Sequence, residues 1–188
     1  GLGRLVEDLR TLSLAEAGQL PMTWEPVDVA ELLADVGVSF GGLAEAAGLT
    51  LTVTSAPGLT LTGDAGRLDQ VLGNLVANAL RHTPRGGAIT LRAEPFSLAD
   101  GRRAVRIIVS DTGEGIAAAD LPYIFDRFWR GDRARTRADG AGSGLGLAIA
   151  RQLVLAHAGS ITAESTAGRG TVFTLDLPLD PTPRPDRA

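Results

Sequence analysis

The stretch "DAGRLDQVLGNLVANALRHTP" (Asp64–Pro84) decides the fold of this 188-residue chain. Apolar residues recur in it every three to four positions, which predicts a helix over about residues 65–82 with one face buried against a sheet. Asp64 can cap the first turn of this helix, and the segment "TPRGG" (83–87) ends it. The buried face is expected to consist of Leu68, Leu72, Leu75, Val76 and Ala79.

The same helix carries a polar stripe, which consists of Arg67, Gln70, Asn74, Asn78 and Arg81. Asparagine is a mediocre helix former because its amide competes with the backbone for hydrogen bonds, yet Asn74 and Asn78 lie four positions apart. The stripe is either a solvated face or a row of amide oxygens for a hard cation, with Arg81 close by for a phosphate.

The segments on both sides of this helix have strand or helix patterns. Alternation of apolar and polar residues predicts strands, and longer stretches with helical spacing predict helices. The expected strands lie at about residues 49–55, 59–62, 88–94, 104–110, 160–164 and 171–177, and the expected helices at about 29–47 and 145–157. This order of helices and antiparallel hairpins indicates an α/β fold, a two-layer sandwich of a sheet and a layer of helices.

Both ends of the chain are expected to lie outside this domain. Leucines at positions 2, 5, 9 and 12 have the spacing of a helix–helix seam, although a terminal amphipathic helix fits equally well. Residues 18–27 contain a glycine and two prolines and are expected to form a linker. The proline-rich residues 179–188 predict a disordered tail. The chain starts without methionine, so we expect it to be a piece of a longer protein.

Two glycine-containing turns frame a charged stretch. The expected strand 104–110 runs into "DTGEGI" (111–116), where glycines let a ligand lie against bare backbone. A plain β-turn or a dinucleotide-binding fingerprint would also fit, but the parallel strand that the fingerprint needs does not follow. The second turn, "GAGSGLG" (140–146), leads directly into an apolar helix, so its backbone amides suit phosphate oxygens better than a flexible linker would.

Composition excludes several classes of protein. The chain has no cysteine, which excludes disulfides and zinc–thiolate sites, and its two histidines are too few for a histidine metal cluster. All 18 basic residues are arginine, so the lysine of a P-loop or of a serine, threonine or tyrosine kinase is missing. A net charge of −4 argues against a nucleic-acid surface, and no apolar run is long enough to span a membrane.

Five motifs follow one another in an informative order. They are Asn-Leu-x-x-Asn-Ala-x-Arg-His-Thr (74–83), Asp-x-Gly-x-Gly-Ile (111–116), Phe-x-Arg-Phe (125–128), Gly-x-Gly-Leu-Gly-Leu (142–147) and Gly-x-Gly-Thr-x-Phe (168–173). Over about residues 28–178 the chain thereby resembles the catalytic ATP-binding domain of bacterial sensor histidine kinases, within the gyrase, chaperone and histidine-kinase ATPase superfamily. Residues 1–17 look like the end of the second helix of that family's dimerisation and phosphoacceptor domain. The resemblance implies a mixed sheet of about five strands with about three helices on one face.

The resemblance also implies roles for individual residues. Asn78 would coordinate a Mg²⁺ that bridges the phosphates of ATP, supported by Asn74, while Arg81 and Arg127 would stabilise phosphate charge. Asp111 would accept a hydrogen bond from the adenine amino group. The remaining nucleotide-binding positions would be His82, Gly113, Gly115, Ile116, Phe125, Gly142, Ser143, Gly144, Leu145, Gly146 and Thr171. The charged stretch would be a flexible ATP lid, anchored by Phe125 and Phe128.

A histidine kinase of this kind donates the γ-phosphate to a histidine on its dimerisation domain for relay to a response regulator. The implied partners are therefore a second copy of the full-length protein and a response regulator. The chain would be the cytoplasmic portion of a membrane-anchored bacterial sensor, attached to the membrane only through N-terminal regions that it lacks. Neither His82 nor His157 has the sequence context of the phosphoacceptor, which we expect to be missing as well.

Two alternatives use the same fold. An ATP-hydrolysing chaperone, a gyrase-like ATPase or an anti-sigma-type serine kinase has a glutamate four residues before the metal asparagine, as a general base. Asn74 occupies that position here, and an amide cannot take a proton at neutral pH. A catalytically silent nucleotide-binding scaffold is the other alternative, and the intact asparagine, aspartate and glycine motifs argue against it.

Overall fold

A five-stranded mixed sheet forms one layer of the computed structural model, which describes residues 1–131 and 142–181. The strand order is β2-β4-β5-β7-β6, in which β2 and β4 are parallel and the other neighbours are antiparallel. The strands are β2 (Thr50–Ser55), β4 (Ala88–Ser97), β5 (Arg103–Asp111), β6 (Ser160–Thr166) and β7 (Gly170–Pro178).

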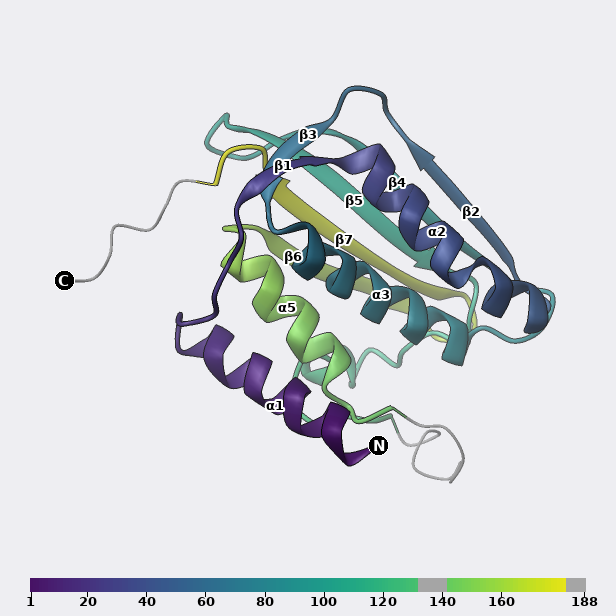
Figure 1. Cartoon of the computed structure of the whole chain (residues 1–188). Helices are drawn as coiled ribbons and strands as arrows, with labels where there is room; N and C mark the ends of the chain where they lie inside the picture. The colour runs from purple at the N-terminus through teal and green to yellow at the C-terminus, as the bar shows by residue number, and fades with distance from the viewer. Residues whose placement is uncertain (132–141, 182–188) are drawn as a thin grey trace.

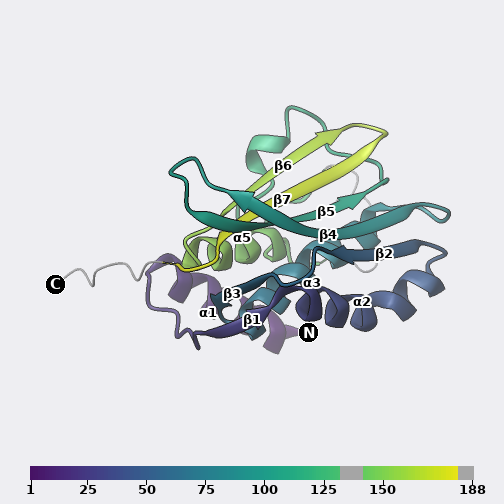
Figure 2. The ribbon, with the colours of Figure 1, turned by 90° about the horizontal axis from the view of Figure 1, so that it is seen from above.

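Helices α2 (Val29–Ala46), α3 (Ala65–His82) and α5 (Gly146–Ala156) form the second layer, and all of them cover the same face of the sheet (Figures 1 and 2). Helix α3 lies between α2 and α5 (Figure 1). A short 3-10 helix, η1 (Leu121–Tyr123), follows β5. The predicted α/β two-layer sandwich, with five strands and three helices on one face, is confirmed.

The apolar face of α3 forms the centre of the core. The five residues predicted for this face are all at most 2% exposed. They pack against inward-facing residues of the sheet such as Ile107 and Phe173. The predicted cap is present, because Asp64 Oδ1 accepts a hydrogen bond from the backbone N–H of Arg67 at 3.0 Å. Burial of a large apolar side chain contributes roughly 1.5–3 kcal/mol, so this helix fixes the layer packing.

A small antiparallel ribbon of β1 (Glu25–Asp28) and β3 (Thr60–Gly63) stands apart from the main sheet. The strand expected at 59–62 is present, but it pairs with β1 rather than with the five-stranded sheet. The last part of the predicted linker 18–27 is therefore wrong, because it belongs to β1. Pro26 hid the strand pattern of β1 in the sequence. Proline has no N–H to donate, and it is tolerated here because each strand of a two-stranded ribbon has an edge that makes no ladder hydrogen bonds.

The predicted disordered tail 179–188 also begins too early. The backbone N–H of Leu179 donates to the carbonyl of Arg103 at 3.1 Å, and its carbonyl accepts from the N–H of Thr62 at 2.8 Å. Leu179 therefore ties the end of β7 to both the main sheet and the small ribbon. The rest of this predicted tail, residues 182–188, lies outside the described residues.

Helix α1 (Leu2–Glu16) packs along the outer side of α5 (Figure 1). Leu12 is fully buried, and Leu5 and Leu9 are partly buried against the core. Leu2 and Val6 are 79% and 58% exposed. The predicted leucine seam is therefore partly covered by α5 of the same chain and partly open. None of the helices in the described ranges is both long and apolar enough to cross a membrane.

His157 joins the end of α5 to the beginning of α3. Its ring is 2% exposed; Nδ1 lies 2.7 Å from the Leu153 carbonyl, and Nε2 accepts the backbone N–H of Asp64 at 3.0 Å. Trp24 covers the ring edge-on at 5.4 Å between ring centroids. Burial lowers the pKa of His157, opposed by the Leu153 carbonyl and by Asp64. The neutral ring, with its proton on Nδ1, therefore fits this position.

Acidification should destabilise the chain through His157. Because the folded-state pKa is lowered, the unfolded state takes up a proton first, and stability is lost as the pH falls below about 6.5 toward the folded-state pKa. Urea denaturation at pH 7.5 and at successively lower pH should show a decreasing free energy of unfolding. His157→Gln, which does not titrate, should flatten this dependence, and an equally steep dependence in the variant would contradict the assignment.

Candidate functional site

The polar stripe of α3, the loop after β5 and the glycine turn before α5 meet on one side of the helical layer. Helices α3 and α5 run antiparallel, so the second half of α3 lies beside the beginning of α5 (Figure 1). Two contacts fix this arrangement: Asn74 Nδ2 donates to the Gly146 carbonyl at 3.0 Å, and the N–H of Glu114 donates to the His82 carbonyl at 3.1 Å. Three of the predicted motifs are thereby brought together.

Asn74 acts as a bridge between helices in this structure. Its amide nitrogen donates a hydrogen bond to the carbonyl of Gly146, the first residue of α5, and Gly146 is half-buried. A Cβ atom at Gly146 would lie 3.7 Å from the Asn74 amide carbon, so the two residues are in van der Waals contact. The amide therefore holds the glycine turn at a fixed place relative to α3.

Asn78 lies one helical turn further along α3, on the same stripe. Its side chain is half-buried and makes no hydrogen bond within the described part of the chain. An amide oxygen without a protein partner is a suitable ligand for a hard cation such as Mg²⁺. Asn78 is therefore available for the metal role, whereas Asn74 is already committed to the fold.

Arg81 brings positive charge to the glycine turn. A Cβ atom at Gly142 would lie 3.0 Å from the Arg81 guanidinium, so the side chain rests directly on that glycine. The surrounding protein partly excludes water and lowers the pKa of Arg81, and the nearby charges of Arg130 and Arg4 lower it further. No carboxylate within the described residues forms an ion pair with Arg81. The unpaired charge of Arg81 beside the glycine turn favours an anionic ligand.

The beginning of α5 adds backbone donors. Helix α5 starts after Leu145 without a side-chain cap, so its first amides have no cap acceptor. Leu145 itself is fully buried and holds the turn in place. The Ser143 hydroxyl accepts the N–H of Leu145 at 3.4 Å. Uncapped amides at a helix start suit an anion, and this turn contacts Arg81 through Gly142 and Asn74 through Gly146.

Asp111 is the buried acid of the site. It ends β5 opposite Thr171 of β7, is only 9% exposed, and accepts the N–H of Gly113 at 2.8 Å through Oδ1. Burial raises the pKa of Asp111, while the backbone N–H groups of Gly113 and Thr171 and the nearby His82 oppose the rise. A buried carboxylate with one oxygen in a backbone hydrogen bond retains acceptor capacity for a ligand that donates.

The glycines of the loop after β5 are needed for protein packing. A Cβ atom at Gly113 would lie 2.5 Å from the His82 carbonyl, and one at Gly115 would lie 2.2 Å from the Thr166 carbonyl. Gly115 also has a φ of +72°, which side chains rarely adopt. These glycines therefore let the loop wedge between α3 and the β6–β7 hairpin, and this packing determines where Asp111 and Ile116 lie.

Ile116 and Thr171 belong to a network centred on Ser165. The Ser165 hydroxyl accepts the N–H of Ile116 at 2.7 Å, donates to the Gly170 carbonyl at 2.8 Å and lies 2.9 Å from the Thr171 hydroxyl. Sequence reasoning missed Ser165, because a serine near the end of an edge strand carries no distinct signal. It also missed Glu114, whose carboxylate lies 3.0 Å from His82 Nδ1.

Another missed group is the hydroxyl of Thr83, directly after α3. Thr83 Oγ1 is buried and has no hydrogen-bond partner among the described residues. A buried polar atom without a partner is unusual in a folded protein. Thr83 follows Arg81 and His82, so the vacant hydrogen-bonding capacity lies at the edge of the site.

Arg127, expected to reach the γ-phosphate, is paired with an acidic residue of α1 in this structure. Its guanidinium makes two hydrogen bonds with the carboxylate of Glu16, at the end of α1, one of them at 3.2 Å from Nε. Phe125 is half-buried, packs edge-on against Phe173 at 6.2 Å between centroids, and lies 6.0 Å from the Arg151 guanidinium. Phe125 is therefore an anchor for this segment.

Phe128, the other expected anchor, does not serve in that way. Its side chain is 56% exposed, and its backbone adopts a left-handed φ of 61° while its N–H donates to the Gly144 carbonyl at 2.9 Å. The segment is held instead by Ile124, which is buried, and by Trp129, which packs on the core. Most of the predicted lid, residues 132–141, lies outside the described residues.

The described residues contain no cluster of histidine, aspartate or glutamate side chains suited to a metal ion. Any cation in this site would therefore depend on Asn78 and on oxygens of the ligand itself. A surface groove between α2 and β2 contains none of these residues. Within the described residues the site is a junction of three segments: the second half of α3, the loop after β5 and the glycine turn before α5.

Comparison with known proteins agrees with this geometry. A family model described as histidine kinase-, DNA gyrase B-, and HSP90-like ATPase matches residues 63–181. The signal transduction histidine-protein kinase BaeS of Escherichia coli K12 is 38% identical over 181 residues, which are 95% of this chain and 37% of that protein. The sensor histidine kinase RppB of Synechocystis is 36% identical over 179 residues, which cover 95% of this chain and 38% of that protein.

Solved structures give the same result. Full-length ShkA in complex with AMPPNP matches with a TM-score of 0.81 and 31% identity, over 100% of this chain and 38% of that one. The nucleotide-free catalytic domain of histidine kinase ThkA matches with a TM-score of 0.73 and 28% identity, over 87% of this chain and 100% of that one. The chain thus spans well under half the length of the curated relatives and about all of a catalytic domain. The chain belongs to the family of histidine kinase-, DNA gyrase B- and HSP90-like ATPases, as a member of its histidine-kinase branch.

Proposed function

We propose that the chain binds Mg²⁺–ATP and donates the γ-phosphate to a histidine on the dimerisation domain of the full-length protein, for relay to a response regulator. The observation that supports this most directly is that three groups without a hydrogen-bond or ion-pair partner among the described residues belong to the segments that meet at the site. They are the Asn78 amide, the Arg81 guanidinium resting on Gly142, and the uncapped start of α5. The AMPPNP in the matching ShkA structure agrees with an ATP ligand.

The residues present fit a magnesium–triphosphate ligand. An amide oxygen, a cationic side chain and helix N-terminal amides are the groups that bind Mg²⁺ and phosphate in proteins. Asn78 would hold Mg²⁺, while Arg81 and the amides of Gly144–Gly146 would hold phosphate oxygens. When bound, Mg²⁺ neutralises part of the phosphate charge.

The adenine end would be read by the loop after β5. The remaining acceptor capacity of the Asp111 carboxylate would take up the adenine amino group, beside Gly113, Gly115, Ile116 and Thr171. Because burial raises the pKa of this carboxyl, its acceptor form requires a pH above that raised value. His82 is paired with Glu114, so it would frame the site through this pair rather than contact the ligand alone.

The reaction needs an acceptor from outside the described residues. A histidine imidazole lone pair would attack the γ-phosphorus, forming a nitrogen–phosphorus bond as the bond to the β-phosphate oxygen breaks and ADP leaves. Arg81 would stabilise the charge. Arg127 would contribute to this stabilisation only after its ion pair with Glu16 is replaced by a contact with a phosphate oxygen. Asn74 donates to Gly146 and is no base, which disfavours an ATP-hydrolysing enzyme on this fold.

The proposed division of the chain follows from this function. Residues 1–17 would be the end of a dimerisation helix, 18–27 the connection, 28–178 the ATP-binding domain, and 179–188 a tail. The structure modifies two of these limits, since β1 begins at Glu25 and Leu179 is tied to the sheet. The full-length protein would be a homodimer. Its N-terminal regions would attach it to a membrane, and the ATP-binding domain would lie on the cytoplasmic side.

Substitution of Asn78 should abolish the metal dependence of nucleotide binding. Calorimetric titration of the wild-type chain should give a higher ATP affinity with Mg²⁺ than with a chelator, and Asn78→Ala should bring this ratio close to one. Gln70→Ala, two turns earlier on the same polar stripe, is the matched control and should keep the dependence. An unchanged Mg²⁺ effect in Asn78→Ala would exclude this residue as the metal ligand.

Substitution of Asp111 should weaken adenine recognition. Asp111→Asn replaces a charged acceptor by an amide that can present a donor to the adenine amino group, which should cost roughly 1–3 kcal/mol of ATP affinity. The wild type should bind GTP poorly, because guanine has an oxygen at that position. Asp69→Asn, on the exposed side of α3, should behave as wild type. Equal wild-type affinities for ATP and GTP would refute the assignment.

The chain alone should neither label itself nor hydrolyse ATP at an appreciable rate. The described site offers no base for water, and the acceptor histidine is expected elsewhere in the full-length protein. Incubation with radiolabelled ATP and a separately made dimerisation domain should produce weak, acid-labile label on that domain, because the tether that raises effective concentration is missing. Acid-stable label on this chain alone, or hydrolysis at the rate of a chaperone ATPase, would favour the alternative enzymes.

A further inference from the structure

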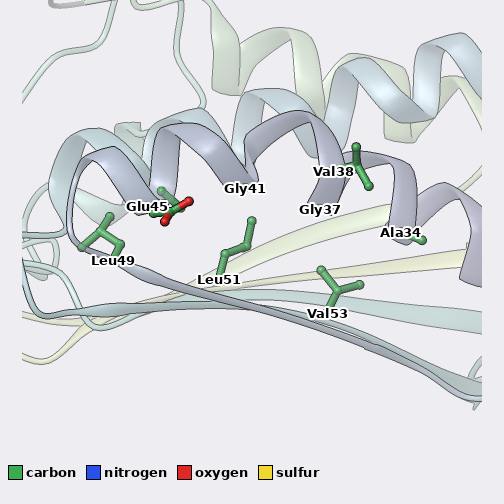
Figure 3. Close-up of a pocket in the computed structure, with 9 residues that line it drawn as sticks. Ala34, Gly37, Val38, Gly41, Glu45, Leu49, Leu51 and Val53 are labelled. Atoms are coloured by element: carbon green, nitrogen blue, oxygen red, sulfur yellow. The ribbon is translucent and has the colours of Figure 1, made fainter.

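A groove of about 570 Å³ lies between α2 and β2, separated from α5 by α3 (Figures 1 and 3). Helix α2 lines it with Ala34, Gly37, Val38, Gly41, Ala44 and Glu45, and Leu49, Leu51 and Val53 line it from β2 and the residue before it. None of these residues takes part in the proposed nucleotide site. The groove is therefore a separate feature of the molecule.

Small residues on α2 keep the groove open. A Cβ atom at Gly37 would lie 2.9 Å from Val53 Cγ2, so helix and strand touch at that point. At Gly41 a Cβ atom would meet nothing within 4 Å, and Leu51 points toward this open part (Figure 3). Leu51 and Val53 are only half-buried, and Val38 on the rim is 82% exposed. Apolar surface is thus left without a cover.

The strand that forms the floor is an edge of the sheet. β2 pairs with β4 on one side only. The N–H groups of Thr50 and Ala56 donate to the β4 side, at 3.0 Å each. Since successive residues of a strand alternate in direction, the N–H and C=O groups of Leu51, Val53 and Ser55 face the open side.

This edge has none of the usual protection. Natural edge strands carry charged residues, proline or bulges that prevent pairing with other chains. Residues 50–55 contain no charged residue and no proline, and they pair with β4 in an unbroken register. An unprotected edge next to an apolar groove is the arrangement that accepts an added strand.

Charge on the rim restricts the partner. Helix α2 carries Glu31, Asp35 and Glu45, of which Glu45 lines the groove, and no basic residue, and β2 is uncharged. The basic side chain of Arg85 rests on Gly48, beyond the end of α2. None of the three carboxylates forms an ion pair within the described part of the chain. A second copy of the chain would bring the same acidic helix toward this rim, whereas a basic segment would neutralise it.

We propose that the β2 edge and the α2 groove bind an extended segment of another protein, apolar at alternate positions and flanked by basic residues. The segment pairs with the outward-facing groups of Leu51, Val53 and Ser55. Its apolar side chains enter the groove over Gly41, and its basic residues face the carboxylates of α2. This is a docking surface distinct from nucleotide binding and from phosphate transfer.

A synthetic peptide tests the proposal on the whole 188-residue chain. The probe is acetyl-Arg-Val-Thr-Val-Thr-Val-Arg-amide, and the matched probe carries glutamate in place of both arginines. Binding is measured by amide chemical shifts of the isotope-labelled chain and by fluorescence anisotropy of the labelled peptide. The basic peptide should shift amides of β2 and of the groove side of α2, with an affinity at least roughly tenfold higher than that of the acidic peptide.

Two glycines of α2 provide matched variants. Gly41→Leu fills the groove, whereas Gly42→Leu places the same side chain one position further around the helix, outside the residues that line it. Both sites are free of contacts within 4 Å, and leucine favours a helix more than glycine does, so both variants should fold. Gly41→Leu should reduce peptide affinity about tenfold or more, and Gly42→Leu should retain it.

Several results would overturn the proposal. They are absence of binding up to about 1 mM peptide, equal affinity for the acidic peptide, or equal loss of binding in both glycine variants. A concentration-dependent dimer of the chain in sedimentation experiments, lost in Gly41→Leu, would assign the groove to a second copy instead. ATP titration of Gly41→Leu should match the wild type, so failure here is distinguishable from failure of the nucleotide site.

Discussion

The hydrogen bond from the Asn74 amide to the Gly146 carbonyl is the interaction on which the candidate site depends. Burial of the apolar face of α3 fixes that helix against the sheet, and this bond, together with buried Leu145, then holds the start of α5 against it. A side-chain amide suits the task because it reaches a backbone carbonyl and carries no charge into a half-buried contact. The next residue of the stripe, Asn78, makes no side-chain hydrogen bond with residues 1–131 or 142–181. One asparagine thus supports the architecture so that its neighbour can serve a ligand.

Close backbone contacts position the other half of the site. Carbonyls of α3 and of the β6–β7 hairpin press on Gly113 and Gly115 so tightly that no side chain fits at either position. These contacts fix the position of the loop after β5, and Asp111 is held between Gly113 and Thr171. Adenine recognition in this fold would therefore rest on backbone packing as much as on the carboxylate itself. The glycines, which resemble a flexible loop in the sequence, mark a rigid part of the molecule.

The sequence predicted the main elements because their hydrophobic periods are strong, as in α3 and its five buried residues. It did not predict β1, because four residues that include Pro26 give no period and only Val27 is buried. For the site, the resemblance implied roles for Asn74, Asn78, Arg81 and Asp111, and the structure brings the segments that carry them together. The sequence did not predict polar contacts between distant segments. These are the contacts of Ser165 with Ile116, of Glu114 with His82, and of Glu16 with Arg127. Such pairs depend on side-chain directions in three dimensions, which local spacing does not encode.

The Glu16–Arg127 ion pair has a consequence for how α1 communicates with the rest of the molecule. Helix α1 is held by two kinds of contact, the buried leucines against α5 and this partly exposed charge pair. Dissolved salt weakens the charge pair by screening but leaves the apolar contact nearly unchanged. The C-terminal end of α1, which carries Glu16, can therefore separate from Arg127 while the rest of the helix stays packed against α5. Rising ionic strength would then weaken the attachment between Glu16 and Arg127 gradually, without releasing α1 as a whole.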